Sequence, residues 1–256
     1  MSDRSWLSRT ALLINENQLT TLENAHVIVI GLGGVGSFTA EFLCRAGIGT
    51  LTIVDGDQVE ASNRNRQLPA LKSTEGRYKT EIMKERLLDI NPDLKLNVIK
   101  EFINPAEVNN LLSFPYDYVV EAIDSVTPKI TTLVAAYRKG LKIVSSMGAG
   151  GKLDPTKIKV VDISETHECR LAQCVRKRLK NHDIRTGIKA VFSYEEVIKE
   201  SLIMTDGTRY KKSAYGTISY LPATFGAVCA SVVIRDLIAT ENTSIENINL
   251  IKDQQA

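Results

Sequence analysis

The sequence has few cysteines, and no two of them form the Cys-x-x-Cys pair that structural zinc sites use. The four are Cys44, Cys169, Cys174 and Cys229. Cys169 and Cys174 are separated by four residues and no second pair accompanies them, so we expect no zinc site. The pattern is typical of reduced thiols in a cytoplasmic protein, and we expect no catalytic nucleophile among them.

Long apolar runs and a strong charge of one sign are also lacking. The first residues contain no signal-peptide pattern, so we expect a cytoplasmic chain rather than a secreted one. The longest apolar stretch, LPATFGAVCASVVI, is too short to span a bilayer comfortably and indicates a core helix, so no membrane partner is expected. Because the formal net charge is only +2, any surface for nucleic acid has to be local.

What the sequence does contain is a regular alternation of strand and helix patterns. An apolar strand over 27–30, a glycine turn, a helix over 37–45 and a strand over 50–54 predict a βαβ unit. Further helices are expected over 10–24, 79–90 and 128–139, and further strands over 96–99, 118–122, 143–146 and 158–162. We therefore predict an α/β, Rossmann-like fold with a doubly wound, mostly parallel sheet.

The pattern changes at about residue 164. A basic helix, a polar stretch and a final apolar helix over 222–238 follow. We interpret residues 164–256 as a C-terminal α-rich extension packed on the domain formed by residues 1–163.

A glycine turn follows the first predicted strand. Gly31, Gly33 and Gly36 have the Gly-x-Gly-x-x-Gly spacing, with Gly34 between them, and a helix N-terminus comes next. Asp55 ends the second strand, where a carboxylate can accept hydrogen bonds from ribose hydroxyls. This arrangement predicts an adenine nucleotide, but it leaves NAD, FAD, SAM and ATP open.

Cationic residues after Asp55 favour ATP. Arg64 and Arg66 follow the second strand, and Lys79 begins the next helix. An enzyme that displaces pyrophosphate needs cations that hold the β- and γ-phosphates and stabilise the leaving group, whereas a dehydrogenase does not. The alternative is that these three are solvated surface charges.

Asp124 follows the strand over 118–122. A carboxylate at the carboxyl end of a parallel strand can hold Mg²⁺ that bridges ATP phosphates. The alternative is that Asp124 caps the helix that follows it.

With these residues assembled, the chain resembles the E1-like adenylating superfamily, which includes ThiF, MoeB and ubiquitin-activating enzymes. The matching sequence motifs are GLGGVG, NRNRQ and AIDS, together with Asp55 and Lys79. The resemblance implies an ATP-binding adenylation domain over residues 1–163 and a homodimer in which Arg9 reaches the partner's ATP site. It also implies a set of cofactor-binding residues: Gly31, Gly33, Gly34, Gly36, Asp55, Asp57, Asn63, Arg66, Lys79 and Asp124, of which Arg66, Lys79 and Asp124 are catalytic and Asp124 supports Mg²⁺.

Within the superfamily, the chain is most similar to the tRNA threonylcarbamoyladenosine dehydratase family. The similarity is carried by RTALL, GLGGVGSFTAEFLCRAGIG, EAIDSVTPK, MGAGGKLDPTKIKVVDIS and LPATFGAV. It implies adenylation of the carboxylate of N6-threonylcarbamoyladenosine at position 37 of tRNA, followed by intramolecular cyclisation that releases AMP. Such a cyclisation needs no thioester carrier, which fits the missing cysteine pairs. The sequence leaves open which tRNAs are used, and whether a monovalent cation (Na⁺ or K⁺) or a sulfur-transfer partner protein binds.

A basic stretch over residues 170–189 is the predicted surface for tRNA. It holds seven basic residues against one acidic residue. The candidates for tRNA contact are Arg170, Arg176, Lys177, Arg178, Lys180 and Arg185. Lys211 and Lys212 are further candidates that would extend the same basic surface. A local basic helix in a nearly neutral chain is a reasonable footprint for a phosphate backbone, and the alternative is a solvated helix face.

Three other functions compete with tRNA modification. One is adenylation of the C-terminal glycine of a ubiquitin-like sulfur-carrier protein, as in the ThiF and MoeB type. Another is a nucleotide-binding module without catalysis, and the last is an NAD dehydrogenase.

Overall fold

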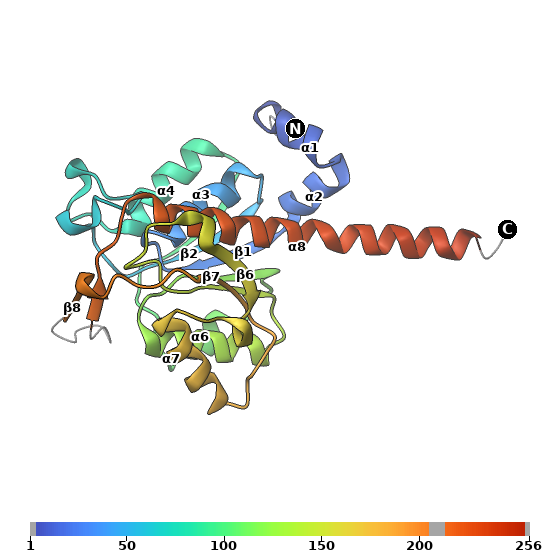
Figure 1. Ribbon diagram of the computed structural model, residues 1–256. Coiled ribbons are helices and arrows are strands. Elements are labelled where there is room, and N and C mark those ends of the chain that lie inside the picture. The colour runs from blue at the N-terminus through green and yellow to red at the C-terminus, as the bar shows by residue number, and fades with distance from the viewer. Residues whose placement is uncertain (1–3, 205–212, 254–256) are drawn as a thin grey trace.

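Seven strands form one sheet at the centre of the computed structural model, which describes residues 4–204 and 213–253 (Figure 1). The strands are β1 (His26–Ile30), β2 (Thr50–Val54), β3 (Lys95–Ile99), β4 (Tyr118–Glu121), β5 (Ile143–Ser146), β6 (Ile158–Asp162) and β7 (Lys189–Ser193). Their order is β3-β2-β1-β4-β5-β7-β6, and only β6 runs antiparallel to its neighbour. The predicted Rossmann-like, mostly parallel sheet is confirmed.

Helices cover both faces of this sheet. They are α1 (Ser8–Leu13), α2 (Glu16–Asn24), α3 (Gly36–Arg45), α4 (Lys79–Ile90), α5 (Val108–Leu111), α6 (Val126–Arg138), α7 (Arg170–Lys180) and α8 (Tyr220–Asp253). Short 3-10 helices lie at η1 (Ser5–Leu7), η2 (Ala61–Asn63), η3 (Lys72–Thr74), η4 (Pro155–Lys157), η5 (Ile163–Glu165) and η6 (Lys199–Ser201). A separate two-stranded antiparallel sheet pairs β8 (Leu202–Met204) with β9 (Ser213–Tyr215).

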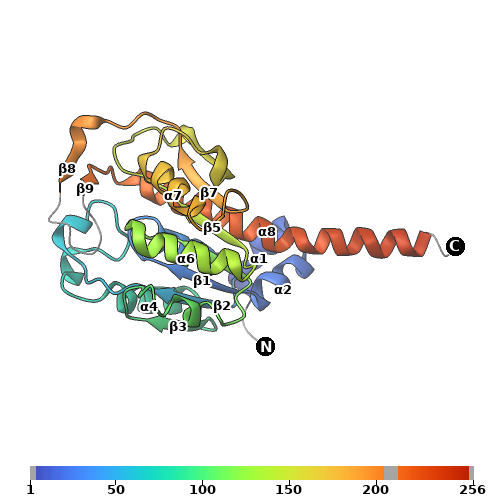
Figure 2. The same ribbon diagram turned by 90° about the horizontal axis from the view of Figure 1, so that it is seen from below.

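The apolar strands face a core on each side. In β1, Val27 and Val29 pack with residues of α2, α3, α4 and α8, whereas Ile28 and Ile30 pack with residues of α5, α6 and α7. Figures 1 and 2 show these two helix layers on opposite faces of the sheet. A strand buried on both faces has to be apolar at every position, which explains the continuous run in the sequence.

The helix predicted over 10–24 is wrong as a single element. The chain breaks between α1 and α2 at Ile14, and Asn15 caps α2. The side chain of Asn15 accepts a hydrogen bond from the backbone N of Gln18, and the Gln18 side chain accepts one from the backbone N of Asn15. This reciprocal capping starts a new helix in the middle of an amphipathic pattern.

The basic stretch over 170–189 is not one helix either. Helix α7 ends at Lys180, and the backbone then turns through Asp183 and Gly187, which both have positive φ. Lys189 begins β7, a strand that sequence analysis missed and that lies between β5 and β6. Residues after 164 therefore supply a strand of the central sheet as well as helices.

The final apolar helix is confirmed as a core helix. Its stretch Tyr220–Ala239 is long and apolar enough to cross a membrane by length and composition, and half of that stretch is buried within the fold. Phe225 and Cys229 have no exposed surface, and α8 packs against α2, α3, β4, β5 and β7. The apolar character of α8 is therefore explained by packing against the sheet.

Candidate active site

The glycine turn lies at the point where the chain connections diverge from the middle of the sheet. From β1 the chain proceeds to β2 and β3 on one side, whereas β4 continues to β5 on the other. The turn at Gly31 follows β1, and Ala122 follows β4. A β-carbon on Gly31 would lie 2.9 Å from the carbonyl oxygen of Ala122, and the φ of Gly31 is +92°. Only glycine fits there, in the crevice where open α/β sheets bind ligands.

The end of the turn is equally tight. Helix α3 begins at Gly36, where a β-carbon would lie 1.7 Å from the carbonyl oxygen of Gly31. The carbonyl oxygen of Gly33 accepts hydrogen bonds from the backbone N and the hydroxyl of Ser37. The turn thus leads directly into a helix N-terminus, whose free N–H groups favour an anion.

Asp55 holds the turn as well as facing the crevice. Its two carboxylate oxygens accept hydrogen bonds from the backbone N of Leu32 (2.6 Å) and of Asp57 (2.7 Å). Burial raises the pKa of the Asp55 carboxyl above its usual value, and the positive charge of Lys79 opposes that rise. Because carboxylate oxygens can accept more than one hydrogen bond each, contact with a ribose remains compatible with this geometry.

Lys79 and Asp57 form an ion pair beside Asp55. The Lys79 Nζ lies 3.1 Å from Asp57 Oδ2, and the Lys79 side chain is only 5% exposed. The backbone N of Lys79 also donates to the carbonyl oxygen of Asp57. Asn63, six residues after Asp57, is buried. Its Oδ1 accepts a hydrogen bond from the backbone N of Glu60, and this bond closes the 3-10 turn that precedes Arg66.

Arg66 lies directly against the glycine turn. A β-carbon on Gly34 would meet the Arg66 carbonyl oxygen at 3.3 Å and its Cγ at 3.5 Å. The Arg66 Nη1 donates to the carbonyl oxygen of Ser62 and to Asn65 Oδ1. Burial lowers the pKa of Arg66, and the negative charge of Asp124 opposes that shift. The turn, Arg66 and Asp124 are therefore brought together from three separate segments.

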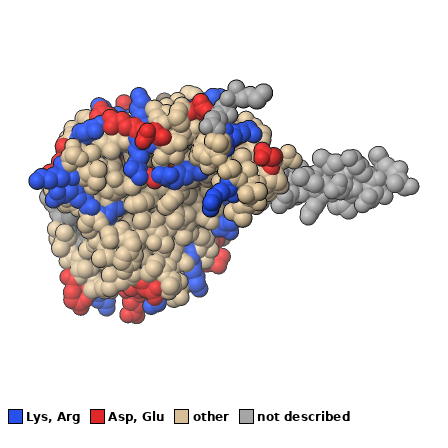
Figure 3. Space-filling model, turned by 90° about the horizontal axis from the view of Figure 1, so that it is seen from above, with Lys and Arg blue, Asp and Glu red and all other residues tan. Residues whose placement is uncertain are grey.

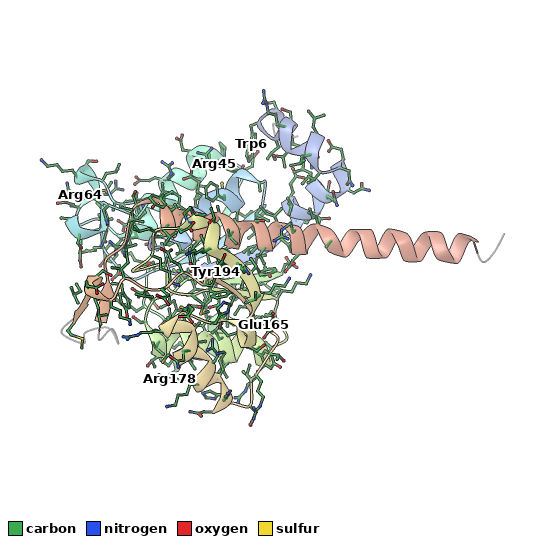
Figure 4. All side chains as sticks on the ribbon, in the orientation of Figure 1. Trp6, Arg45, Arg64, Glu165, Arg178 and Tyr194 are labelled. Carbon is green, nitrogen blue, oxygen red and sulfur yellow. The ribbon has the colours of Figure 1, made fainter. Side chains whose placement is uncertain are left out.

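Arg64 does not belong to this group. Its Nε lies 3.4 Å from Glu75 Oε1, and both side chains are exposed. Figure 4 shows Arg64 extending away from the body of the molecule. The surface-charge alternative holds for Arg64, although it does not hold for Arg66 or Lys79, which are half-buried and buried.

Asp124 is exposed at the end of β4, next to the start of α6. The N-cap residue of α6 is Ser125, and its side chain makes no capping hydrogen bond. The Ser125 hydroxyl instead lies 3.5 Å from Asp124 Oδ1. The N-cap position of α6 is therefore taken by Ser125 and not by Asp124, which lies one residue before it.

Arg9 lies in α1 and is exposed. In Figures 1 and 2, α1 lies at one side of the molecule, and the segment that contains Arg64 and the strand β8 lies at the other. The fold therefore does not bring Arg9 to the site of its own chain.

The basic residues of the predicted tRNA surface have different environments. Arg170, Lys177, Arg178, Lys180 and Arg185 are exposed. Arg176, in contrast, is half-buried and donates a hydrogen bond to the hydroxyl of Thr166, so part of its role is structural. Lys211 and Lys212 lie outside the described residues.

Arg178 links this surface to the site. Its Nη1 lies 3.3 Å from the hydroxyl of Thr127, three positions after Asp124. Figure 4 places Arg178 on the outer side of α7. Figure 3 shows the molecule from above, and on that face Lys and Arg are interspersed with Asp and Glu. One of the exposed cations of α7 thus lies beside the start of α6.

Two features of the site were not assigned from the sequence. The Gln67 side-chain oxygen is buried without a hydrogen-bond partner, and its Nε2 lies 3.9 Å from where a β-carbon on Gly33 would be. The start of α8 also borders the turn, since Pro222 packs on Gly34 and a β-carbon on Gly226 would lie 2.6 Å from the Val35 carbonyl oxygen. Gln67 could have been assigned from the sequence, because it ends the NRNRQ motif. The contact between α8 and the turn could not, because no local sequence pattern relates these two distant segments.

Comparison with known proteins agrees with this geometry. The ThiF family profile matches residues 7–254. The chain is 37% identical to the tRNA threonylcarbamoyladenosine dehydratase of Bacillus subtilis, over 90% of this chain and 94% of that one. It is 36% identical to the Escherichia coli protein of the same name, over 92% and 95%. The crystal structure of E. coli TcdA in complex with ATP superposes with a TM-score of 0.86 at 37% identity, covering 94% of this chain and 98% of that chain, and a complex with AMP is equally similar in fold.

Proposed function

The chain belongs to the ThiF family, and we propose that it is an ATP-dependent enzyme that dehydrates threonylcarbamoyladenosine in tRNA to its cyclic form. The observation that carries this proposal is the convergence of Arg66 and Asp124 on the glycine turn, in a chain whose relatives over nearly its whole length bear that activity in their names. An ATP site alone would fit many adenylating enzymes. The substrate that we propose therefore rests on the names of the relatives.

The residues present fit ATP. A β-carbon would be too close to neighbouring atoms at Gly31, Gly34 and Gly36, and because the glycines carry no side chain, phosphates can approach the backbone N–H groups at the start of α3. Arg66 and Lys79 supply positive charge on two sides, and Asp55 lies where a ribose would bind. Asp57 and Asn63 hold the segments that carry these groups.

Asp124 is the residue that we assign to Mg²⁺. Among the described residues, no three His, Cys, Asp or Glu side chains gather into a metal cage. A single carboxylate combined with ATP phosphates is how Mg²⁺ is commonly held, so Asp124 fits the ion. The ion would neutralise charge on the phosphates during transfer. A monovalent cation stays a prediction without an assigned ligand.

The reaction requires two displacements. A carboxylate oxygen of the threonylcarbamoyl group attacks the α-phosphorus of ATP, and pyrophosphate leaves. A nitrogen of the same group then attacks the activated carbonyl carbon and loses its proton, and AMP leaves with the former carboxylate oxygen. The net change in the nucleoside is the loss of one water. Arg66 and Lys79 would stabilise the charge that builds on pyrophosphate in the first step.

A homodimer would complete the site. Arg9 is exposed on α1, away from its own glycine turn, and the same N-terminal segment exposes Trp6 (40%), Leu12 (89%) and Leu13 (86%). Large apolar side chains at such exposure favour contact with another chain. We infer that α1 packs on a second copy and that Arg9 reaches the partner's phosphates.

The exposed cations of α7 are the proposed tRNA contact. They lie along α7, and one of them, Arg178, lies beside the first turn of α6, so a tRNA held there would lie near Asp124. A sulfur-transfer partner protein and a cytoplasmic location remain predictions.

Nucleoside mass spectrometry tests the proposed function. Purified protein is incubated with Mg²⁺–ATP and tRNA that carries threonylcarbamoyladenosine, and the digested nucleosides are analysed. We expect loss of one water from that nucleoside, with AMP and pyrophosphate formed in equal amounts. The matched control is the Asp124→Ala variant. No water loss, combined with pyrophosphate exchange that responds to a sulfur-carrier protein, would instead favour the ThiF and MoeB type of reaction.

A further inference from the structure

A buried ion pair lies behind the turn that carries Asp124. Glu121 ends β4 and Lys129 lies near the start of α6. Both side chains are 0% exposed, which is true of no other ion pair in the described part of the chain. No step of the proposed chemistry uses either residue.

The pair is fully hydrogen-bonded. One carboxylate oxygen of Glu121 accepts from Lys129 Nζ and from the hydroxyl of Ser145 (2.6 Å). Lys129 Nζ also donates to the carbonyl oxygen of Ser146 (2.9 Å) and lies 3.3 Å from the Ser145 hydroxyl. The other carboxylate oxygen of Glu121 accepts from the backbone N of Ile123 (2.8 Å). The network therefore joins the ends of β4 and β5 to the start of α6.

Stability alone does not explain such a network. Removing two charges from water has a large desolvation cost, and replacement of a buried pair by apolar residues of similar volume is often neutral or stabilising. A purely structural junction between β4, β5 and α6 could be built from apolar side chains. What an apolar junction would lack is an acceptor for the Ile123 N–H and a fixed direction for the residue that follows.

That residue is Asp124. The hydrogen bond from the backbone N of Ile123 to Glu121 holds the residue immediately before Asp124, and Lys129 lies in the first turns of α6, the helix that begins two residues after Asp124. The carboxylate of Asp124 projects from a short segment that is anchored at both ends by one buried ion pair. Neither Glu121 nor Lys129 is accessible to a nucleotide, so any effect on the reaction has to pass through this segment.

We propose that Glu121 and Lys129 are positioning residues that set the Asp124 carboxylate for Mg²⁺–ATP. The inference rests on the proposed function only for the role of Asp124. Supporting groups behind metal ligands commonly change metal affinity or activity by about 10- to 100-fold when they are removed. We expect an effect in this range, confined to the part of ATP binding that depends on Mg²⁺.

The test compares two double variants. Glu121→Leu with Lys129→Met removes both charges and the acceptor for Ile123, whereas Glu121→Gln with Lys129→Met keeps an acceptor at position 121. ATP affinity is titrated with and without Mg²⁺, and thermal unfolding is recorded alongside. For the Leu–Met variant we expect Mg²⁺-dependent ATP affinity to fall by about tenfold or more, with the Mg²⁺-free affinity unchanged. The Gln–Met variant should recover part of that affinity.

Thr132→Val is the matched control. Thr132 lies in the same helix, is fully buried, and its hydroxyl has no hydrogen-bond partner. Its replacement should leave both ATP affinities unchanged. Equal decreases of affinity with and without Mg²⁺ in the Leu–Met variant, or no decrease at all, would overturn the proposal and leave the pair a structural element.

A further variant and the absence of tRNA from the titrations ensure that the experiment gives a clear result. If the Leu–Met variant does not fold, Ser145→Ala removes only the hydroxyl that links β5 to Glu121, and it should lower the Mg²⁺-dependent affinity by a smaller factor; an unchanged affinity would count against the proposal. The titrations contain no tRNA, so they decide the positioning role even if the wild-type protein fails to dehydrate the nucleoside. Failure of the proposed function and failure of this inference are thereby distinguishable.

Discussion

The carbonyl oxygen of Gly31 lies 1.7 Å from the place that a β-carbon on Gly36 would take. No side chain can be added at position 36 unless the backbone of the phosphate-binding turn moves, because the blocking atom is itself part of that turn. Among the glycines of the turn, Gly36 is therefore the one with the least room for a β-carbon.

We predict that Gly36→Ala abolishes ATP binding. Forcing extra atoms into a packed site typically costs about 1–3 kcal/mol, and here the displaced atom is backbone, so the fold should lose stability too. Isothermal titration with ATP and thermal unfolding measure the two effects. Gly148→Ala is the control, since a β-carbon there would make ordinary contacts at 3.7 Å with Cys169 and Leu171. ATP affinity like that of the wild type in Gly36→Ala would contradict the assigned turn.

Arg66 and Arg64 offer a matched pair two residues apart. Arg66→Ala should reduce the rate of AMP formation by about 10²- to 10³-fold, as expected when a group that stabilises transition-state charge is removed. Arg64→Ala should change it little, because Arg64 forms an exposed ion pair with Glu75, and such pairs contribute little. Steady-state kinetics with modified tRNA measure both. Similar rate reductions in the two variants would mean that only the local charge matters.

Mixed dimers test the role of Arg9. Arg9→Ala and Arg66→Ala should each be nearly inactive as homodimers. In a mixed dimer, one site would combine an intact Arg66 with an intact Arg9 from the partner, so random exchange should restore roughly one quarter of wild-type activity. The measurement is AMP formation after the two variants are unfolded and refolded together. Activity that never exceeds the sum of the separate variants would place Arg9 outside the partner's site.

Salt dependence tests the tRNA surface on α7. Lys177→Gln and Lys180→Gln should weaken tRNA binding and reduce the slope of log affinity against log salt by about 0.7–0.9 for each phosphate that the variant no longer neutralises. The control is Lys95→Gln, an exposed lysine on β3 at the far edge of the sheet. Filter binding over a range of salt concentrations gives the slopes. Equal slopes in all variants would move the tRNA surface away from α7.

Glu41 predicts a pH dependence of stability. Burial by itself raises the pKa of the Glu41 carboxyl, but hydrogen bonds from Arg86 and Arg45 outweigh burial, and its pKa lies below the usual value. A depressed pKa in the folded state contributes stability that is present above the unfolded-state pKa and is lost as pH falls through the folded-state pKa. Glu41→Gln should therefore destabilise the protein at neutral pH, and the difference from wild type should shrink in acid.

Urea unfolding at a series of pH values measures this difference. Glu81→Gln is the control, because Glu81 lies on α4 and forms an exposed pair with Lys100, which follows β3. We expect little change in the free energy of unfolding for Glu81→Gln at any pH. A difference between wild type and Glu41→Gln that stays constant with pH would mean that packing, and not the ionised carboxylate, joins α3 to α4.

Much of the fold could be predicted because its signals are local. The strands β2, β5 and β6 and the helix α4 occur at the predicted residues, since each is a short apolar or amphipathic segment bounded by turn residues. The strand β7 was missed because its apolar run AVF is short and follows a basic helix. Its position between β5 and β6 depends on pairing with distant strands, which no local pattern contains.

The sequence by itself determined the glycine turn, the residue types around it and the family. Spacing along the chain is enough for these because a turn and its helix are contiguous, and steric limits act between near neighbours. The resemblance selects Arg66 and not Arg64, and the tertiary structure supplies the physical reason: the two have the same chemistry and lie two residues apart, but Arg66 packs on the glycine turn and Arg64 forms an exposed ion pair with Glu75. Only the tertiary structure revealed the Glu121–Lys129 pair, because burial of a charge depends on which strands and helices meet around it.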